Sequence, residues 1–207
     1  MDERSRIVAA GYDRVADDYE RLEDPAAPWP RLRRLRELLA LVPEGGTVLD
    51  LGCGNGLPVL REIARRHVAV GADISGEQVR RARANVPDAT VLHADMSELE
   101  LEAGSFDAIV SCYSIEHVPR ERHADLFARI HAWLKPGGSL LFAVEAREGF
   151  EAVGSWLETP MFFSLLDEAD TLRILGEGQA ARGTAGMRDA ARGRQADRVR
   201  VAARLTR

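Results

Sequence analysis

Cysteine and lysine are scarce in this chain of 207 residues, which contains two cysteines and a single lysine, Lys135. Cys53 and Cys112 lie in separate apolar stretches, with no second cysteine or histidine at a metal-ligand spacing. The pattern therefore indicates neither a zinc site nor a disulfide framework, and we expect two buried free thiols. No cluster of carboxylates suited to magnesium is recognisable either, so we expect no metal site.

Long hydrophobic runs are also missing. The longest apolar stretches, such as residues 140–144, fall far short of the ~20 residues that a membrane-spanning helix needs. The first residues are charged and lack the apolar segment of a signal peptide. We therefore predict a cytoplasmic protein with no membrane partner.

Positive charge is in deficit over most of the chain. The formal net charge is −5, and residues 177–207 hold eight arginines against three acidic residues, a surplus of +5 that leaves −10 for residues 1–176. An acidic body of this kind repels a phosphate backbone, so we expect no nucleic-acid partner.

Short apolar runs alternate with segments of helical periodicity from residue 47 onward. This order is typical of βαβ units that stack into a parallel sheet covered by helices on both faces. The predicted fold class is therefore α/β, with a Rossmann-like, doubly wound, mainly parallel sheet. The expected strands are 47–51, 68–73, 90–94, 106–113 and 138–145.

Local signals mark the helices between these strands. Pro58 fits the first turn of a helix over residues 58–66, because its missing N–H is not needed there. Ser75 and Gln78 have the spacing of a capping box at the start of a second helix. A third helix is expected over residues 120–134, where the Lys-Pro-Gly-Gly that follows should end it.

Three segments of different character divide the chain. Residues 1–45 are expected to form lid helices, at 5–22 and 31–41, before the sheet domain of residues 46–176. Residues 177–207 form a tail rich in alanine, arginine and glycine, with no aromatic residue. Such a tail offers little to bury and could stay disordered.

The most specific feature is a strand that runs directly into a loop with glycine at every second position, Asp50-Leu51-Gly52-Cys53-Gly54-Asn55-Gly56. Such glycines let a ligand approach the backbone, although similar loops also occur for packing alone. A dinucleotide-binding loop would have its third glycine at position 57, where Leu57 stands, and the Gly-Lys of a P-loop is absent. Asp50 suits an ammonium or sulfonium cation better than a pyrophosphate. The predicted ligand is therefore cationic near this loop and has no diphosphate.

Two further carboxylates follow the next two predicted strands. Asp73 lies about 20 residues beyond the loop, where an acid can hold both hydroxyls of a ribose, although an aspartate at a strand end is also a common helix cap. Asp95 can accept from an adenine amino group, and Met96 can pack on the ring. Three consecutive strands therefore direct acids toward one crevice.

These residues together resemble the class I S-adenosylmethionine-dependent methyltransferases, in the branch that modifies quinones and microbial natural products. The resemblance covers roughly residues 8–175 and rests on Tyr12-Asp13 with Tyr19 and on the segments 50–56, 71–75, 94–96, 113–117 and 134–138. It implies S-adenosylmethionine as cofactor, S-adenosylhomocysteine as product, and an N-terminal pair of tyrosines that closes over the site. The cofactor-binding residues that it implies are Tyr12, Tyr19, Asp50, Gly52, Cys53, Gly54, Gly56, Asp73, Ile74, Gln78, Asp95, Met96 and Cys112.

Methyl transfer needs alignment, exclusion of water and at most one base, so no catalytic triad is expected. His117, just past the fourth predicted strand, is the candidate general base, and a structural histidine bonded to the backbone is the alternative interpretation. Glu116 could instead orient an amine, and His123 is expected to be solvated. By resemblance, residues 161–164 would border the acceptor pocket, although such aromatics are more often plain core.

Motifs that are absent narrow the acceptor. The fourth predicted strand ends in Ser111-Cys112-Tyr113-Ser114 and not in the Asp/Asn-Pro-Pro-Tyr of methyltransferases that act on amino groups of nucleic acids and proteins. Nor does a proline precede Cys112, as it would in enzymes that methylate cytosine at C5. We therefore predict methyl transfer to an O, N or C atom of a small metabolite, in secondary metabolism.

Two other functions compete with this one. A noncatalytic S-adenosylmethionine-binding protein, or pseudo-enzyme, would keep the crevice without turning over an acceptor, and the unusual C-terminus favours it. A nicotinamide-dependent reductase is disfavoured by Asp50, by Leu57 and by the absence of a Tyr-x-x-x-Lys pair.

The tail departs from the resemblance. Members of the family finish with an antiparallel hairpin at the sheet edge, but here residues 176–179 read Gly-Glu-Gly-Gln where that hairpin should approach, and only Val199, Val201 and Ala203 alternate as in a strand. The hairpin is therefore expected to be atypical or missing. A bare edge on the fifth strand would favour a homodimer.

Overall fold

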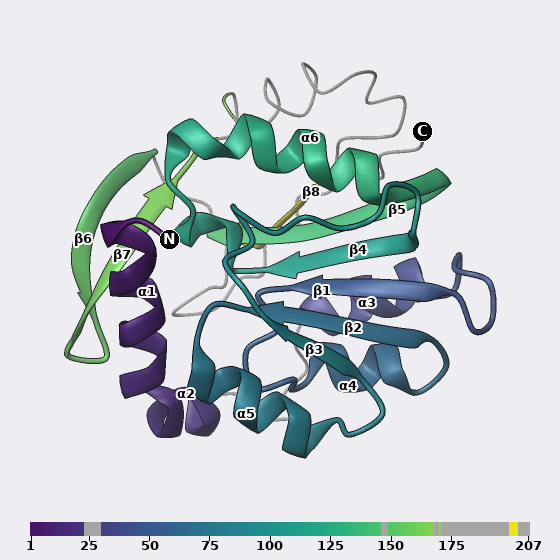
Figure 1. The fold of residues 1–207 in the computed structure, drawn as a ribbon, viewed down its shortest axis with the longest axis horizontal. Coiled ribbons are helices and arrows are strands. Elements are labelled where there is room, and N and C mark those ends of the chain that lie inside the picture. Colours follow the sequence, from purple (N-terminus) through teal and green to yellow (C-terminus); the bar gives the residue numbers. More distant parts are fainter. Residues whose placement is uncertain (23–29, 146–148, 168–169, 171–198, 203–207) are drawn as a thin grey trace.

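The computed structural model describes residues 1–22, 30–145, 149–167, 170 and 199–202, and its centre is a six-stranded sheet (Figure 1). The strand order is β3-β2-β1-β4-β5-β8, in which β8 is antiparallel and the other pairs are parallel. This order confirms the predicted Rossmann-like, mainly parallel sheet. The strands are β1 (Thr47–Leu51), β2 (Val68–Asp73), β3 (Thr90–His93), β4 (Phe106–Cys112), β5 (Leu134–Glu145) and β8 (Val199–Ala202).

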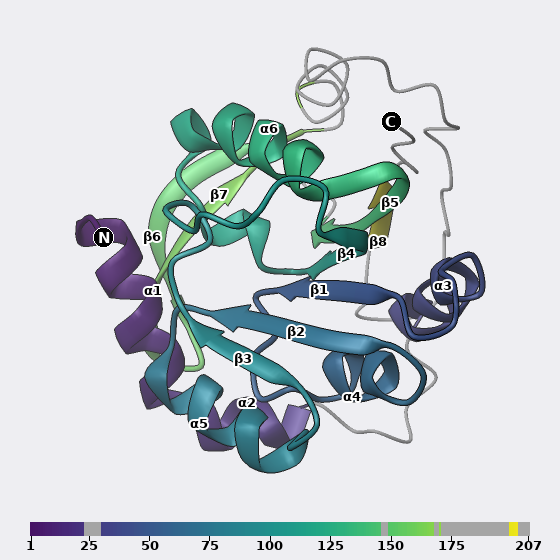
Figure 2. The same cartoon turned by 45° about the vertical axis from the view of Figure 1, so that its right-hand side comes forward.

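Helices cover both faces of the sheet, as a doubly wound fold requires. The helices α3 (Pro30–Leu39), α4 (Val59–Ala64) and α5 (Gly76–Asn85) pack on one face, and α6 (His123–Trp133) packs on the other. Figure 2 separates α6 from α3 and α4 on opposite sides of the strands. Because side chains alternate along a strand, Val48 of β1 joins the cluster under α3, whereas Leu49 and Leu51 join the cluster under α6.

The strand β5 begins four residues earlier than predicted, directly at the end of α6. Leu134 pairs with Phe106, and the ladder shifts register before it resumes between Ala108 and Ser139. The Lys-Pro-Gly-Gly segment therefore lies inside the strand and is not a loop after the helix. Lys135 is fixed there because its Nζ lies 2.7 Å from Oδ2 of Asp107.

The N-terminal segment forms α1 (Glu3–Arg14) and α2 (Ala16–Leu22), where one helix was predicted. In Figure 1, α1 lies across the carboxyl ends of the parallel strands. The expected second lid helix, α3, differs in position, since its apolar residues Leu32, Leu35 and Leu38 pack in the core cluster against the sheet.

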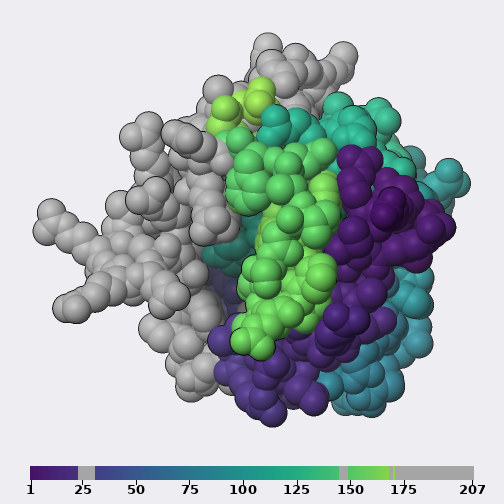
Figure 3. Space-filling view, turned by 90° about the vertical axis from the view of Figure 1, so that its left-hand side faces the viewer, coloured from purple at the N-terminus to yellow at the C-terminus, as the bar shows by residue number. Residues whose placement is uncertain are grey.

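A hairpin of β6 (Phe150–Trp156) and β7 (Thr159–Leu165) lies side by side with α1, as Figure 3 shows in green beside purple. Val8 of α1 packs with Met161 and Phe162 of β7 in a small apolar cluster. We call α1, α2 and this hairpin the cap. The remaining helices and the six-stranded sheet form the core of the fold.

The turn of the hairpin explains why the sequence did not predict it. Leu157 and Glu158 both have positive φ, 48° and 60°, between the paired residues Trp156 and Thr159. A two-residue turn of this type normally contains asparagine, aspartate or glycine. Leu-Glu carries no such signal.

The capping box at Ser75 forms only in part. Its Oγ accepts from the backbone N of Gln78 at 3.1 Å, but neither polar atom of the buried Gln78 amide has a hydrogen-bond partner. A second hydrogen-bond acceptor at the N-terminus of α5 comes instead from Asp13 of α1. Its Oδ1 accepts from the backbone N of Glu77 at 3.0 Å and from Ser75 Oγ at 2.6 Å. The cap is thereby fastened to the start of α5.

The C-terminal edge of the sheet differs from one expectation. The strand β8 pairs with residues 142–145 of β5. The prediction of a bare edge on the fifth strand, which was the reason to expect a dimer, is therefore wrong over this stretch. The other residues of the tail, 177–198 and 203–207, lie outside the described part, and so does the predicted disorder. Among the helices described, none is both long and apolar enough to cross a bilayer.

Candidate cofactor and acceptor site

A cavity of about 620 Å³, including its open mouth, lies between the core and the cap. It is at the carboxyl ends of β1 and β4, where the strand order reverses and ligands bind in folds of this class. The lining residues are Gly52, Gly54, Asp73, Ile74, Ala94, Asp95, Met96, Cys112, Tyr113, Ser114, His117 and Val118 from the core and Ser5, Val8, Tyr12 and Tyr19 from the cap.

Most of the predicted site residues line this cavity, but Asp50, Cys53, Gly56 and Gln78 do not. All four are buried beneath the glycine loop or at its junction with α5. The sequence did not point to Ser5 and Val8, because no local pattern reveals that α1 crosses the strand ends.

The glycine loop has the backbone that only glycine adopts readily. Gly52, Gly54 and Gly56 have φ values of 74°, 53° and 82°, in the left-handed region. A Cβ on Gly52 would also lie 2.2 Å from Cβ of Ser114, which is an impossible approach. The loop is thus held close against β4 and leaves space above it for a ligand.

Asp73 is held rigidly at the end of β2. Its Oδ2 accepts from the backbone N of Gly54 at 2.8 Å, and its Oδ1 accepts from the backbone N of Ser75 at 2.9 Å. Burial raises the pKa of this carboxyl, and the two backbone donors oppose that shift. Each oxygen keeps a lone pair, so the side chain can still accept from two hydroxyls in the cavity.

Asp50 lies beneath the loop and is 2% exposed. Its Oδ2 has no hydrogen-bond partner. Burial, together with the negative charge of Asp73, raises the pKa of Asp50 to about 8, while Arg31 opposes the shift. A buried acid without sufficient positive charge around it fits a ligand that brings a cation to this loop. Together with the glycine cradle, it fits the predicted cofactor.

Both ring nitrogens of His117 form hydrogen bonds. Its Nδ1 lies 2.7 Å from the carbonyl oxygen of Phe162 in β7, and its Nε2 lies 2.8 Å from the hydroxyl of Tyr12 in α1. A carbonyl only accepts, so Nδ1 carries the proton and Nε2 accepts from Tyr12. Burial lowers the pKa of His117 to about 4, which keeps the ring neutral at physiological pH. His117 is therefore bonded to the backbone, as the structural interpretation expects, and it also lines the cavity. Its role as a general base stays a prediction.

A group of aromatic rings in the cap lies at the cavity, and two of them, Tyr12 and Tyr19, are among its lining residues. Tyr12, Tyr19 and Trp156 lie with ring centroids 5.4 to 5.8 Å apart, and Phe163 lies 5.1 Å from the ring of His117. Rings packed at these distances leave little room for water between them. The wall joins α1 to the hairpin.

Three neighbouring expectations have different outcomes. His123 is not solvated: it is 1% exposed, and its Nε2 donates to the carbonyl of Val118 at 2.7 Å, because the short segment before α6 folds back over it. Glu116 is buried and is not among the lining residues. Residues 161–164 do not line the cavity, and Met161 and Phe162 belong to the apolar cluster. They contact the lining residue His117 through the carbonyl of Phe162 and the ring of Phe163.

Within the described ranges, no three histidine, cysteine, aspartate or glutamate side chains gather as metal ligands would. Neither Cys53 nor Cys112 forms a disulfide; Cys53 is buried as expected, whereas Cys112 is only partly buried. Burial raises the pKa of the Cys53 thiol. That the protein has no metal site stays a prediction.

Comparison with known proteins gives several matches. A family model described as a methyltransferase domain matches residues 48–138. The 27-O-demethylrifamycin SV methyltransferase of Amycolatopsis mediterranei is 31% identical over 195 residues, which cover 84% of this chain and 67% of that protein. An uncharacterized methyltransferase of Mycobacterium tuberculosis is 34% identical over 142 residues, which cover 65% of this chain and 71% of that protein.

Two solved structures share the fold. The 1,6-didemethyltoxoflavin-N1-methyltransferase of Burkholderia thailandensis, with bound 1,6-didemethyltoxoflavin and S-adenosylhomocysteine, is 21% identical with a TM-score of 0.74, over 99% of this chain and 90% of that one. An S-adenosylmethionine-dependent methyltransferase from Mesorhizobium loti is 24% identical with a TM-score of 0.57, over 73% of this chain and 81% of that one.

Proposed function

This chain belongs to the class I S-adenosylmethionine-dependent methyltransferases, and we propose that it methylates a hydroxyl or amine of a small, largely apolar metabolite. It is an enzyme whose cofactor is S-adenosylmethionine. The contact between Tyr12 and His117, inside the cavity that also holds the glycine loop, carries the proposal about the acceptor.

The core residues would hold the cofactor in the way the family resemblance implies. Gly52 and Gly54 would face its methionine part, Asp73 the ribose hydroxyls and Asp95 the adenine amine. When bound, S-adenosylmethionine supplies an electrophilic methyl group on a sulfonium. The residues of this chain align the two reactants and exclude water, and proximity of this kind lowers the barrier by several kcal/mol, about 7–11 at best.

The lining of the cavity supports an acceptor without an anionic group. None of its described lining residues is a lysine or an arginine, so an anionic group on the acceptor would lie next to no basic lining side chain. The rings of Tyr12 and Tyr19 line the cavity and offer an apolar wall instead, with Trp156 packed against both. Two similar proteins are named for methylating 27-O-demethylrifamycin SV and 1,6-didemethyltoxoflavin. These names support a polycyclic or heteroaromatic product of secondary metabolism as the acceptor.

Tyr12 is the group that would contact the acceptor, with His117 behind it. The Tyr12 oxygen can accept a hydrogen bond from the acceptor while its own proton points to Nε2 of His117. As the methyl group arrives, the acceptor proton passes to Tyr12 and the tyrosine proton passes to Nε2. The low pKa of His117, about 4, makes it a weak base. The pair therefore suits an acceptor with an acidic O–H or N–H, such as a phenol or enol.

The test is a turnover assay with a panel of hydroxylated and aminated aromatic compounds. Transfer is followed as S-adenosylhomocysteine release and as a gain of one CH₂ in acceptor mass. Phenols and enols should be methylated, and their phosphorylated or carboxylated analogues should not. Preference for the anionic analogues would contradict the proposed acceptor class.

Several wider features remain proposals. We retain the cytoplasm as location and the absence of a nucleic-acid partner. Because β8 covers residues 142–145 of β5, a homodimer would have to form through another surface. The noncatalytic alternative, which the C-terminal tail suggested, gains no support from the site, since most of the expected cofactor residues and the Tyr12–His117 pair line one cavity.

A further inference from the structure

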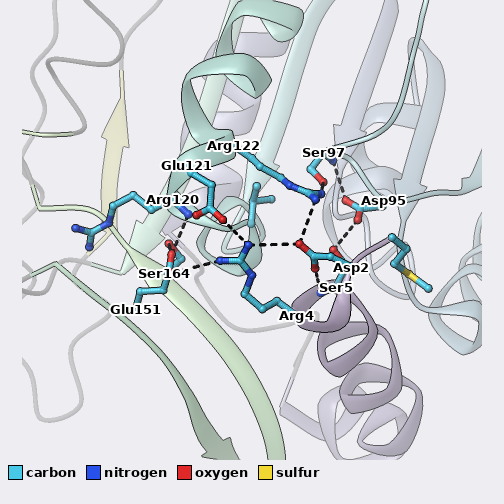
Figure 4. Close-up of polar contacts among 12 residues, drawn as sticks. Asp2, Arg4, Ser5, Asp95, Ser97, Arg120, Glu121, Arg122, Glu151 and Ser164 are labelled. Atoms are coloured by element: carbon cyan, nitrogen blue, oxygen red, sulfur yellow. Dashed lines mark hydrogen bonds and ion pairs between the residues drawn. The ribbon is translucent and has the colours of Figure 1, made fainter.

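A buried serine of the cap lies against the acid that is expected to hold adenine. Oγ of Ser5 donates to Oδ2 of Asp95 at 2.7 Å, while Oδ1 of Asp95 accepts from the backbone N of Ser97 at 2.8 Å (Figure 4). Ser5 is 4% exposed, and both side chains line the cavity. The first turn of α1 therefore completes the adenine end of the site.

Ser5 is fixed by its neighbours in the chain. Oδ1 of Asp2 accepts from the backbone N of Ser5 at 2.9 Å and so caps α1. Oδ2 of Asp2 lies 3.1 Å from Arg122, and the same guanidinium donates to Oγ of Ser97 at 2.9 Å. Arg122 thus braces the turn that carries Ser5 against the loop that carries Asp95, as Figure 4 shows.

A second set of ion pairs joins the same turn to the hairpin. Arg4 pairs with Glu121 and lies 3.5 Å from Oε1 of Glu151 in β6. The other oxygen of Glu151 accepts from the backbone N of Arg120 at 2.9 Å and from Oγ of Ser164 at 2.9 Å. We call Asp2, Arg4, Glu121, Arg122 and Glu151 the clasp.

The hydrogen-bonding capacity of the Ser5–Asp95 pair limits what it can bind. Asp95 has only acceptors when ionised, and Ser5 has already directed its one proton to Asp95. At the cavity, the Ser5 hydroxyl oxygen and the Asp95 carboxylate are therefore both available only as hydrogen-bond acceptors. Two acceptors suit an amino group, which has two protons to donate, and disfavour a carbonyl oxygen, which has none.

From this arrangement we infer that Ser5 is a further specificity residue for the cofactor, which shares recognition of the adenine amine with Asp95. The inference rests on the proposed placement of the cofactor. The clasp positions Ser5, so that closure of the cap adds selectivity at the adenine end. The selectivity arises because a base with a carbonyl oxygen in place of the amine would leave the Ser5 and Asp95 oxygens without a hydrogen-bond donor, and buried acceptors without a donor cost free energy.

The experiment is calorimetric titration with S-adenosylhomocysteine and with S-inosylhomocysteine, in which a carbonyl oxygen replaces the adenine amine. Ser5→Ala should weaken binding of the adenine compound about fivefold to tenfold, as expected for one hydrogen bond near a charge, and leave the inosine compound almost unchanged. Ser5→Thr, which keeps the hydroxyl, should restore the selectivity. Arg6→Ala, an exposed change on the same turn, is the matched control and should alter neither affinity.

The possible results separate the inference from the placement of the cofactor. If Ser5→Ala weakens both compounds equally, or neither, Ser5 is only structural and the inference is wrong. If the wild-type protein binds neither compound, the proposed cofactor site fails and the inference fails with it. No acceptor is needed, so the outcome does not depend on which metabolite is methylated.

Discussion

The core and the cap differ in the kind of interaction that stabilises each of them. In the core, continuous apolar clusters pack on both faces of the sheet, and the ligand residues are backbone-bound at strand ends, as Asp73 is. The cap has one small apolar cluster around Val8 and is otherwise fastened by polar contacts such as Asp13 to Glu77. This difference fits the proposed roles, in which core residues hold most of the cofactor and residues of the cap complete the site.

The largest effect should come from the most constrained core position. Gly52→Ala places a Cβ 2.2 Å from Ser114 Cβ at a φ of 74°, and should cost about 2–5 kcal/mol of folding free energy and abolish cofactor binding. Gly104→Ala is the matched control, since Gly104 also has a positive φ but open space around it, and should cost only about 1–2 kcal/mol. Denaturant unfolding and cofactor titration measure both. Equal losses in the two variants would show that close packing of the loop is unimportant.

The next effect separates turnover from cofactor binding. Tyr12→Phe and His117→Asn should each lower kcat about 100-fold, because the proton relay is broken, while cofactor affinity changes less than about threefold. Since burial lowers the pKa of His117 to about 4, the acidic limb of the kcat profile should lie near pH 4. A limb near pH 6.5 that disappears in His117→Asn would show that the ring is solvated, and would break the distinction between cap and core.

The comparison between regions also shows what a sequence can reveal. The strands and the acids Asp73 and Asp95 were predicted because each depends on a run of a few residues and on the common rule that parallel strands end at one edge. Ser5 and the hairpin turn at Leu157 were missed, because one depends on a contact 90 residues away and the other lacks turn residues. Features of the cap such as these depend on contacts between segments far apart in the chain, and local sequence patterns do not predict such contacts.

A smaller effect concerns Asp50, whose pKa is raised to about 8 in the folded protein from about 4 in an unfolded chain. The folded state binds the proton more tightly, so between pH 4 and pH 8 the protein without cofactor should lose stability as pH rises. A cation at the loop releases that proton, so affinity for S-adenosylmethionine should rise with pH up to about 8.

Asp50→Asn should remove both trends. It should stabilise the cofactor-free protein at pH 8 by about 1–3 kcal/mol, because no buried charge remains, and weaken cofactor binding about tenfold. Thermal unfolding and calorimetry across this pH range provide the measurements. An unchanged pH dependence in the variant would show that another group titrates.

The smallest effect is expected at the clasp, whose side chains are partly exposed. Arg4→Ala should weaken S-adenosylhomocysteine binding about twofold to threefold at low salt, since exposed ion pairs contribute at most about 1 kcal/mol. The difference from wild type should vanish near 1 M salt, where such pairs are screened. A loss that persists at high salt would mean that the Arg4 side chain acts by packing, for example on Phe162, whose ring centroid lies 5.6 Å from the guanidinium.

The most direct test of the account is calorimetric titration of wild type and of Asp73→Asn with S-adenosylmethionine, with the exposed change Asp88→Asn as control. The wild type and the control should bind with micromolar affinity, and Asp73→Asn should bind about 100-fold more weakly or not at all, because two charge-assisted hydrogen bonds are lost. Equal binding by Asp73→Asn and wild type, in folded protein, would contradict the central claim that the core crevice around Asp73 is the cofactor site.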